Sequence, residues 1–201
     1  MPAVPRTELE SEIPRLLEAR GGRAFDGGLR IVLTRGGRRL LLTEPVPGKP
    51  STIRLATVTY APTRILDNVK SLSYAANMLA TRLAQERGFD EALLVTPHGR
   101  VLEAPTSSLF WVTHHGTLCT PPLSEHILAS ITRDRVMKVV DVEERACTLE
   151  DLRDATEAFL TSTNREAQGI SAIDEIQLST GTRTGEVSAA LNARIEEELG
   201  L

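Results

Sequence analysis

The sequence predicts a mixed α/β fold in two domains, residues 1–49 and 50–201. Short apolar runs separated by glycine-containing turns recur along the chain, and this pattern is typical of strands joined as hairpins. Segments with apolar residues at helical spacing stand between these runs. Residues 45–50 contain three prolines and are the best candidate for a linker. We therefore expect a small α/β N-terminal domain and a larger domain in which outer helices cover a hairpin-rich mixed sheet.

The N-terminal domain is predicted to contain one helix and one hairpin. Residues 7–20 have a helical pattern, with Pro14 as a kink or a late start. Strands are expected at 29–34 and 39–43, because the glycine pair between them favours a hairpin turn. The glycine-rich stretch 21–28 precedes a strand rather than a helix, so it is not a dinucleotide-binding fingerprint.

The larger domain is predicted to begin with a strand at 53–60, followed by a helix that ends at Gly88. Glycine suits the left-handed position just after a helix. Apolar residues at helical spacing predict one buried stripe on this helix, formed by Leu72, Ala76, Leu79 and Leu83. Lys70 is expected at the mouth of the helix, where Tyr74, four residues later, would share its face.

The rest of the larger domain is predicted to alternate short strands and helices. Strands are expected at 91–96, 101–104, 109–113, 117–120, 142–146, 157–163 and 170–173. Helices are expected at 131–140, from 148 onward, and at 185–199. Ser130 is placed to cap the first of these helices, and Thr148 with Asp151 has the arrangement of a capping box at the second.

The composition is that of an ordinary globular protein, with 41 % hydrophobic and 25 % charged residues. A net charge of −4 argues against nucleic acid or an anionic membrane as the main partner. No apolar window is long enough to span a membrane, and the N-terminus lacks the apolar core of a signal peptide, so we expect a cytoplasmic protein. Cys119 and Cys147 have no metal-binding spacing and the four histidines are scattered, so we expect no metal site.

Lysine is scarce in this chain. Only three of the 23 lysine and arginine residues are lysines. Arginine keeps its proton at any useful pH and cannot attack a carbonyl group. Schiff-base chemistry would therefore require Lys49, Lys70 or Lys138. Lys49 lies in a proline-rich turn and Lys138 lies among charged neighbours in a helix. Lys70, next to small and hydroxyl-bearing residues, is the best candidate, although it could also be a solvated residue at a helix start.

Three further features look suited to chemistry. Glu103 ends a hairpin strand and precedes small residues, where it could meet a ligand nitrogen or simply face solvent. The segment Ser130-Ile-Thr132 opens a helix, whose free amides could hold an anion or merely carry a cap. The segment Thr161-Ser-Thr163 ends a strand and offers hydroxyls and amides, or is a plain strand edge. A lysine, a carboxylate, a phenol and an anion site are together what pyridoxal phosphate (PLP) chemistry requires.

These residues stand in runs that resemble the class IV, or fold-type IV, PLP-dependent aminotransferases, a family of branched-chain aminotransferases, D-amino acid aminotransferases and 4-amino-4-deoxychorismate lyases. The resemblance covers most of residues 29–200. The matching runs are Val69–Tyr74, Asp90–Leu94, Glu103 with Ser107–Phe110, Leu118–Leu123, Ile127–Asp134 and Glu157–Thr163.

The resemblance implies a role for each matching residue. Lys70 corresponds to the Schiff-base lysine that also moves the proton, and Glu103 to the partner of the pyridine nitrogen. The cofactor phosphate would be held by the backbone amides of Ile131 and Thr132 and by Thr163, and Tyr74 would lie near the ring.

Some positions depart from the family pattern. Ala104 and Pro105 follow Glu103 where members often have glycine, and Asn164 and Arg165 follow Thr163 where many have small residues. Asn164 and Arg165 are candidates for substrate binding, and Arg133 is expected to point along a helix flank. The family's phosphate-binding arginine has no counterpart before residue 29. We therefore expect a fragment or a shortened homologue with the remainder of a small N-terminal domain.

The function implied by the resemblance is transamination between a small, branched-chain-like amino acid and a 2-oxo acid, with PLP as cofactor and a homodimer as the complete assembly. Tyr74 favours transamination over the first alternative, a 4-amino-4-deoxychorismate lyase. The second alternative is a shortened, non-catalytic homologue with a binding role.

Overall fold

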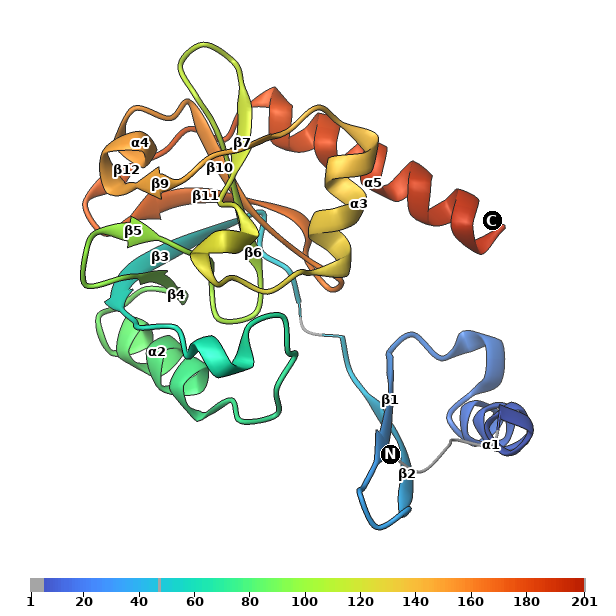
Figure 1. Ribbon diagram of the computed structural model, residues 1–201. Helices are drawn as coiled ribbons and strands as arrows, with labels where there is room; N and C mark the ends of the chain where they lie inside the picture. Colours follow the sequence, from blue (N-terminus) through green and yellow to red (C-terminus); the bar gives the residue numbers. More distant parts are fainter. Residues whose placement is uncertain (1–5, 47, 201) are drawn as a thin grey trace. The chain divides into compact units, whose positions relative to one another are not determined.

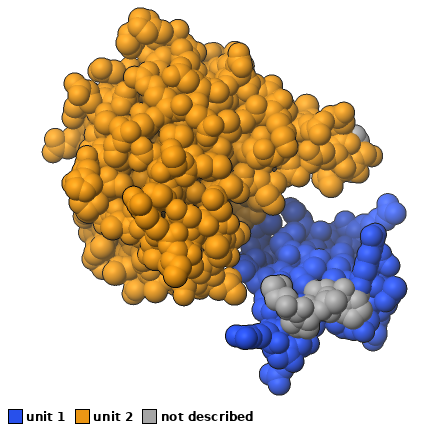
Figure 2. Space-filling model, in the orientation of Figure 1, with its two compact units in different colours: residues 1–49 blue, residues 50–201 orange. Residues whose placement is uncertain are grey.

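The structure, a computed structural model, describes residues 6–46 and 48–200. The chain divides into two units, residues 1–49 and residues 50–201, which Figure 2 shows in separate colours. Each unit is described by itself below.

The first unit contains a helix and a hairpin, as predicted (Figure 1). Helix α1 (Arg6–Ala19) continues through Pro14, so the expectation that Pro14 marks a late start is wrong. A short 3-10 helix, η1 (Gly22–Ala24), precedes the antiparallel strands β1 (Gly28–Leu33) and β2 (Arg39–Glu44). Arg39 in β2 binds Glu12 in α1 at 2.7 Å, which joins the helix to the hairpin. No described side chain of this unit is fully buried, because one helix and two strands enclose little volume.

The second unit is built on a ten-stranded mixed sheet, which confirms the predicted fold class. Its strand order is β8-β7-β6-β10-β11-β3-β4-β5-β9, with β12 beside β11. The central pairs β11 with β3 and β3 with β4 are parallel, whereas β6, β10 and β11 run antiparallel. The strands are β3 (Thr52–Thr59), β4 (Glu91–Val95), β5 (Arg100–Val101), β6 (Ser108–Val112), β7 (Leu118–Thr120), β8 (Glu143–Glu144), β9 (Cys147–Thr148), β10 (Glu157–Ser162), β11 (Glu166–Ile173) and β12 (Ile176–Gln177).

Helices cover this sheet from outside (Figure 1). The described helices of the unit are η2 (Arg64–Leu66), α2 (Ala75–Glu86), η3 (Leu123–Glu125), α3 (Ile131–Val139), α4 (Leu149–Arg153) and α5 (Thr182–Leu199). Helices α3 and α5 pack together against β10 and β11, where Val187 and Leu191 meet the stacked rings of Phe110 and Phe159, 5.3 Å apart. Helix α2 packs against β3 and β4. No helix within residues 6–46 and 48–200 is long and apolar enough to cross a membrane.

The prediction that apolar residues before Gly88 form a buried stripe is wrong. Leu72 precedes α2 and is 98 % exposed, and Leu79 and Leu83 are also exposed, as is Ala76. The residues of α2 that face the sheet are Ala80 and Ala84, packed on Ala92, Leu94 and Leu102. Alanines allow a helix to approach a sheet closely, and the spacing of the leucines shows only that they share a face, not which face is covered. Gly88 does end the helix in the left-handed region, with φ of +81°.

The predicted caps are confirmed. Ser130 Oγ accepts a hydrogen bond from the Arg133 amide at 3.4 Å at the start of α3, and Thr148 with Asp151 forms a complete capping box at α4. The local sequence did not reveal β9 and β12, because each has only two residues. The strand expected at 101–104 is shorter than predicted, since β5 ends at Val101.

The start of α5 depends on a buried carboxylate from β10. The Glu157 side chain accepts hydrogen bonds from the amides of Arg183 and Thr184, at 3.1 and 3.0 Å, and from the Thr184 hydroxyl at 2.9 Å. Gly181 lies against this carboxylate, and a Cβ atom there would come within 2.1 Å of Glu157 Oε1.

We therefore expect Gly181→Ala to lower the free energy of unfolding by about 1–3 kcal/mol, the usual effect of overpacking. The added methyl group must displace a carboxylate that three hydrogen bonds hold in place. The matched control is Gly185→Ala in the same helix, where a Cβ atom meets nothing within 4 Å. It should raise the free energy of unfolding by up to ~1 kcal/mol, because alanine favours helix. Urea unfolding of both variants tests the pair, and equal effects would contradict it.

Candidate active site

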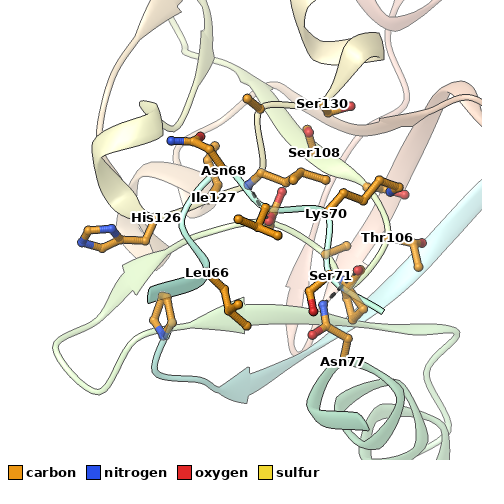
Figure 3. Close-up of a pocket in the computed structure, with 18 of the residues that line it drawn as sticks. Leu66, Asn68, Lys70, Ser71, Asn77, Thr106, Ser108, His126, Ile127 and Ser130 are labelled. Atoms are coloured by element: carbon orange, nitrogen blue, oxygen red, sulfur yellow. Dashed lines mark hydrogen bonds between the residues drawn. The ribbon is translucent and has the colours of Figure 1, made fainter. Parts of the chain in front are cut away.

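The second unit contains a cavity of about 440 Å³ beside the sheet. Three segments provide most of its lining: residues 60–77 before and within α2, residues 103–108 after β5, and residues 126–132 leading into α3. Figure 3 shows Lys70, Ser108 and Ser130 coming from these three segments around one space. Six of the residues singled out in the sequence line this cavity: Lys70, Tyr74, Glu103, Ile131, Thr132 and Thr163. Their proposed roles stay predictions.

Lys70 lies in a loop, not at the mouth of a helix as predicted. The loop follows η2, and α2 begins only at Ala75. Ser71 follows Lys70 directly, and its Oγ atom accepts a hydrogen bond from the Ser73 amide at 3.0 Å, which competes with helix formation. The expectation that Lys70 and Tyr74 share a helix face is therefore wrong, but both residues line the cavity.

Tyr74 and Asn77 attach the start of α2 to the segment that follows Glu103. The Tyr74 hydroxyl donates a hydrogen bond to the Pro105 carbonyl, and Asn77 Nδ2 donates to the same oxygen at 3.0 Å. Burial raises the pKa of Tyr74, and the charges of Glu103 and Glu91 raise it further. The phenol is therefore neutral near pH 7 and acts as a hydrogen-bond donor.

Glu103 is a partly buried carboxyl group whose environment disfavours its charge. Burial raises its pKa to about 7, against the opposing effects of the Leu128 amide and of the charges on Arg133 and Lys70. The Leu128 amide donates to Glu103 Oε1 at 3.0 Å, which fixes the orientation of the group. A cationic nitrogen placed in the cavity would stabilise the charged form.

The raised pKa predicts how the stability of the cofactor-free protein depends on pH. Below pH 4.5 the Glu103 carboxyl is protonated in both the folded and unfolded states. Between its ordinary value of 4.5 and the folded value of about 7, the unfolded state loses the proton first, so the free energy of unfolding falls as pH rises. The difference between the two pKa values lowers the free energy of unfolding by about 3 kcal/mol once both states have lost the proton.

We therefore expect the free energy of unfolding of Glu103→Gln, relative to that of the wild-type protein, to increase by about 3 kcal/mol between pH 4.5 and pH 8, because the amide cannot ionise. Urea unfolding of both cofactor-free proteins at several pH values measures this change. A difference between the two proteins that does not vary with pH would show that Glu103 ionises normally.

The end of the cavity at α3 is suited to an anion. Ile131 and Thr132 are in the first turn of this nine-residue helix, where backbone amides have no intrahelical partner and the helix dipole favours negative charge. Thr163 follows β10 at the same cavity.

Sequence reasoning gave no role to two hydroxyls of the lining. The Oγ atoms of Ser107 and Ser108 are buried and have no hydrogen-bond partner among the described residues. A buried hydroxyl without a partner is costly, so these two atoms are suited to a polar ligand. The signal in the sequence is the run Thr106-Ser-Ser just before a strong apolar strand.

Three residues considered for anion or substrate binding lie outside the lining. Arg133 is buried and binds the Pro121 carbonyl at 3.0 Å and Glu144 at 2.6 Å, so the expectation that it points along the helix flank is wrong. Arg165 pairs with the buried Glu91 and binds Gln168 at 2.6 Å. Asn164 is exposed. No arginine appears among the described residues that line the cavity.

The sequence and the structure of this chain are similar to those of known aminotransferases. The family model for amino-transferase class IV matches residues 1–173. A putative branched-chain-amino-acid aminotransferase of Methanocaldococcus jannaschii is 33 % identical over 86 % of this chain and 67 % of its own length. D-alanine aminotransferase of Bacillus licheniformis is 31 % identical over 95 % of this chain and 75 % of its own length. The structure of the fold IV-transaminase CpuTA1 from Curtobacterium pusillum has a TM-score of 0.77 at 28 % identity, over 96 % of this chain and 72 % of that one.

Proposed function

The chain belongs to the class IV aminotransferase family, and on this premise we propose that it transfers an amino group between a small amino acid and a 2-oxo acid. Members of this family depend on pyridoxal 5'-phosphate. The observation that supports the proposal best is the meeting of an amine, a carboxyl group with a raised pKa and a helix N-terminus in one cavity.

The residues of the cavity fit this cofactor. The unpartnered hydroxyls of Ser107 and Ser108 and the amides of Ile131 and Thr132 would meet its polar groups, with Thr163 beside them. Glu103 would face the ring nitrogen and hold a proton there. When bound, the cofactor supplies an electron sink for the bonds at the substrate Cα.

The remaining tasks fall to side chains of this chain. Lys70 would supply the amine that holds the cofactor. Once the substrate amine has taken its place there, the free Nζ atom would take the proton from the substrate Cα and deliver it to the cofactor. Tyr74, neutral near pH 7, holds the backbone at Pro105 and so keeps the Glu103 segment in place. Leu66, Val69 and Ile127 give part of the wall an apolar character that suits a short aliphatic side chain.

For the substrate, we propose a branched-chain-like amino acid as the donor. The name of the Methanocaldococcus jannaschii relative supports this choice, whereas that of the Bacillus licheniformis relative makes D-alanine the comparison to test. Arg165 and Asn164 remain candidates for contact with the substrate, although both lie outside the described lining.

The complete assembly is proposed to be a cytoplasmic homodimer, as the family resemblance implies. Exposed apolar side chains before and on α2, with Ile65 at 86 % and Met78 at 61 % exposure, are consistent with a surface that a second copy covers.

The proposed function is tested with the purified protein and added pyridoxal 5'-phosphate. L-valine or L-leucine with 2-oxoglutarate should give glutamate and the matching 2-oxo acid, at a higher rate than D-alanine. Release of pyruvate from aminodeoxychorismate, without transamination, would replace the proposal by the lyase. A protein that binds no cofactor and develops no yellow colour would favour a non-catalytic binding role.

A further inference from the structure

The segment that carries Lys70 has little packing against the rest of its unit. Residues 61–73 lie between β3 and α2, and their apolar side chains are largely exposed: Ile65 at 86 %, Val69 at 53 % and Leu72 at 98 %. Burial of these side chains therefore contributes little to holding the segment in place. Polar contacts must supply whatever attachment the segment has.

Most hydrogen bonds of this segment stay within it. The amides of Leu66, Asp67 and Val69 donate to carbonyls three residues earlier, at 2.9, 3.1 and 2.9 Å, and the Ser73 amide donates to Ser71. These bonds shape the segment but do not attach it to the sheet. On the C-terminal side of the segment, Tyr74 binds Pro105.

One contact joins residues 61–73 to another part of the described chain by a hydrogen bond. The Nδ1–H group of His126 donates to Asp67 Oδ2 at 2.6 Å. Asp67 is three residues before Lys70, and His126 follows η3 on another wall of the cavity. Both side chains are about one-third exposed or less, at 33 % and 28 %, so water screens the contact less than at an open surface. Figure 3 shows His126 on the side of the cavity where Leu66 and Asn68, the neighbours of Asp67, also lie.

The backbone at this contact adds a second observation. His126 has φ of +65° and Asn68 has φ of +59°, both in the left-handed region. Glycine adopts this region most readily, and among the other residues asparagine and histidine enter it more often than most. A glycine could therefore take the place of His126 without a change of backbone, so the contact with Asp67 can be removed by substitution at this position.

We propose that the Asp67–His126 pair is a positioning device that holds residues 61–73, and with them the Lys70 amine, at the cavity. The pair acts through the backbone and does not touch the reacting atoms. The inference rests on the proposed function only for its effect on turnover. The attachment itself is a property of the cofactor-free protein.

Hydrogen exchange in the cofactor-free protein tests the attachment. The main variant is His126→Gly, because glycine suits the left-handed backbone and should fold at least as well while losing the side chain. Asp67→Asn is the second variant, which keeps the size of the side chain and removes its charge. In both variants the amides of Leu66, Asp67 and Val69 should exchange roughly tenfold faster, as expected for the loss of a charge-assisted hydrogen bond. The Leu94 amide, which donates a hydrogen bond to the backbone carbonyl of Glu103, serves as an internal reference.

The matched control is Glu125→Gln. It removes the negative charge from the contact of Glu125 with Arg100, which is 3.0 Å long. Glu125 is the residue next to His126, and its contact with Arg100 does not involve residues 61–73. Exchange in the segment should stay at the wild-type rate. Wild-type exchange in both His126→Gly and Asp67→Asn would overturn the proposal, and so would acceleration in Glu125→Gln equal to that in the two variants.

Labelling of amines with acetic anhydride gives a readout of Lys70 itself, with Lys49 and Lys138 as internal references on the same chain. The ratio of Lys70 labelling to theirs should change several-fold in His126→Gly and stay constant in Glu125→Gln. With cofactor and substrate, kcat of His126→Gly should fall about tenfold with little change in KM. If exchange and labelling change as expected while even the wild-type protein lacks turnover, the proposed function fails and the attachment stands.

Discussion

Replacing Lys70 by alanine is expected to abolish transamination, with a loss of at least ~10³-fold in kcat. The proton transfer that Lys70 would perform is by itself worth roughly 10²–10⁴-fold. No arginine can replace the amine, because the guanidinium group stays protonated. Of the two other lysines, Lys138 is exposed and pairs with Asp134 at 2.7 Å, and neither Lys138 nor Lys49 lines the described cavity.

Two measurements check this expectation. Borohydride reduction of the protein with bound cofactor, followed by tryptic mapping, should find the adduct on Lys70. An adduct on Lys49 or Lys138 would disprove the assignment of Lys70 as the lysine that binds the cofactor. Lys138→Ala is the matched control, and it should keep wild-type kcat because only a surface ion pair is lost.

The second large effect is expected from Glu103→Gln, which should keep the cofactor bound and lower kcat by ~10–150-fold. That range is the equivalent of one charge-assisted hydrogen bond, worth about 1.5–3 kcal/mol. A glutamine can still accept the bond from the Leu128 amide, so the local fold should persist. It cannot hold a proton on a ring nitrogen, which is the contribution proposed for the carboxylate.

Steady-state kinetics with saturating cofactor, together with an absorbance titration of cofactor binding, separates the two contributions of Glu103. Near-normal kcat in Glu103→Gln would show that another group faces the ring nitrogen. A large loss of cofactor affinity with unchanged kcat would assign Glu103 to binding instead of catalysis.

Much of the fold could be predicted because its signals are local. The turn at Gly88, the cap at Ser130 and the capping box at Thr148 each depend on a few neighbouring residues, and all three are present in the structure. The strand at 53–60 was also recognisable from its alternating apolar and polar residues, and in the structure both of its faces are covered, with Leu55 and Ala56 in different apolar clusters.

The parts that local sequence patterns predicted wrongly depend on distant contacts. The leucine spacing before Gly88 could not show that Ala80 and Ala84, not the leucines, would face the sheet. Likewise, nothing near Arg133 reveals that Glu144 and the Pro121 carbonyl would enclose its guanidinium group.

The candidate site was accessible from the sequence where residues fell in recognisable runs, as Lys70 and Glu103 do. The contact of Asp67 with His126 joins positions 59 apart in the chain, and no local pattern connects them. The two serine hydroxyls were overlooked for a different reason: only the three-dimensional structure shows which polar atoms lack a partner.

The close approach of Gly181 to the Glu157 carboxylate also has a consequence for sequence drift. A change at only one of these positions is expected to be selected against. An added Cβ atom at 181 would displace the carboxylate, and loss of the carboxylate would leave the amides at the start of α5 without their acceptor. A shorter aspartate at 157 would open room for alanine at 181. Among descendants of this chain, the two sites should therefore accept substitutions as a coupled pair, although they are 24 positions apart in the sequence.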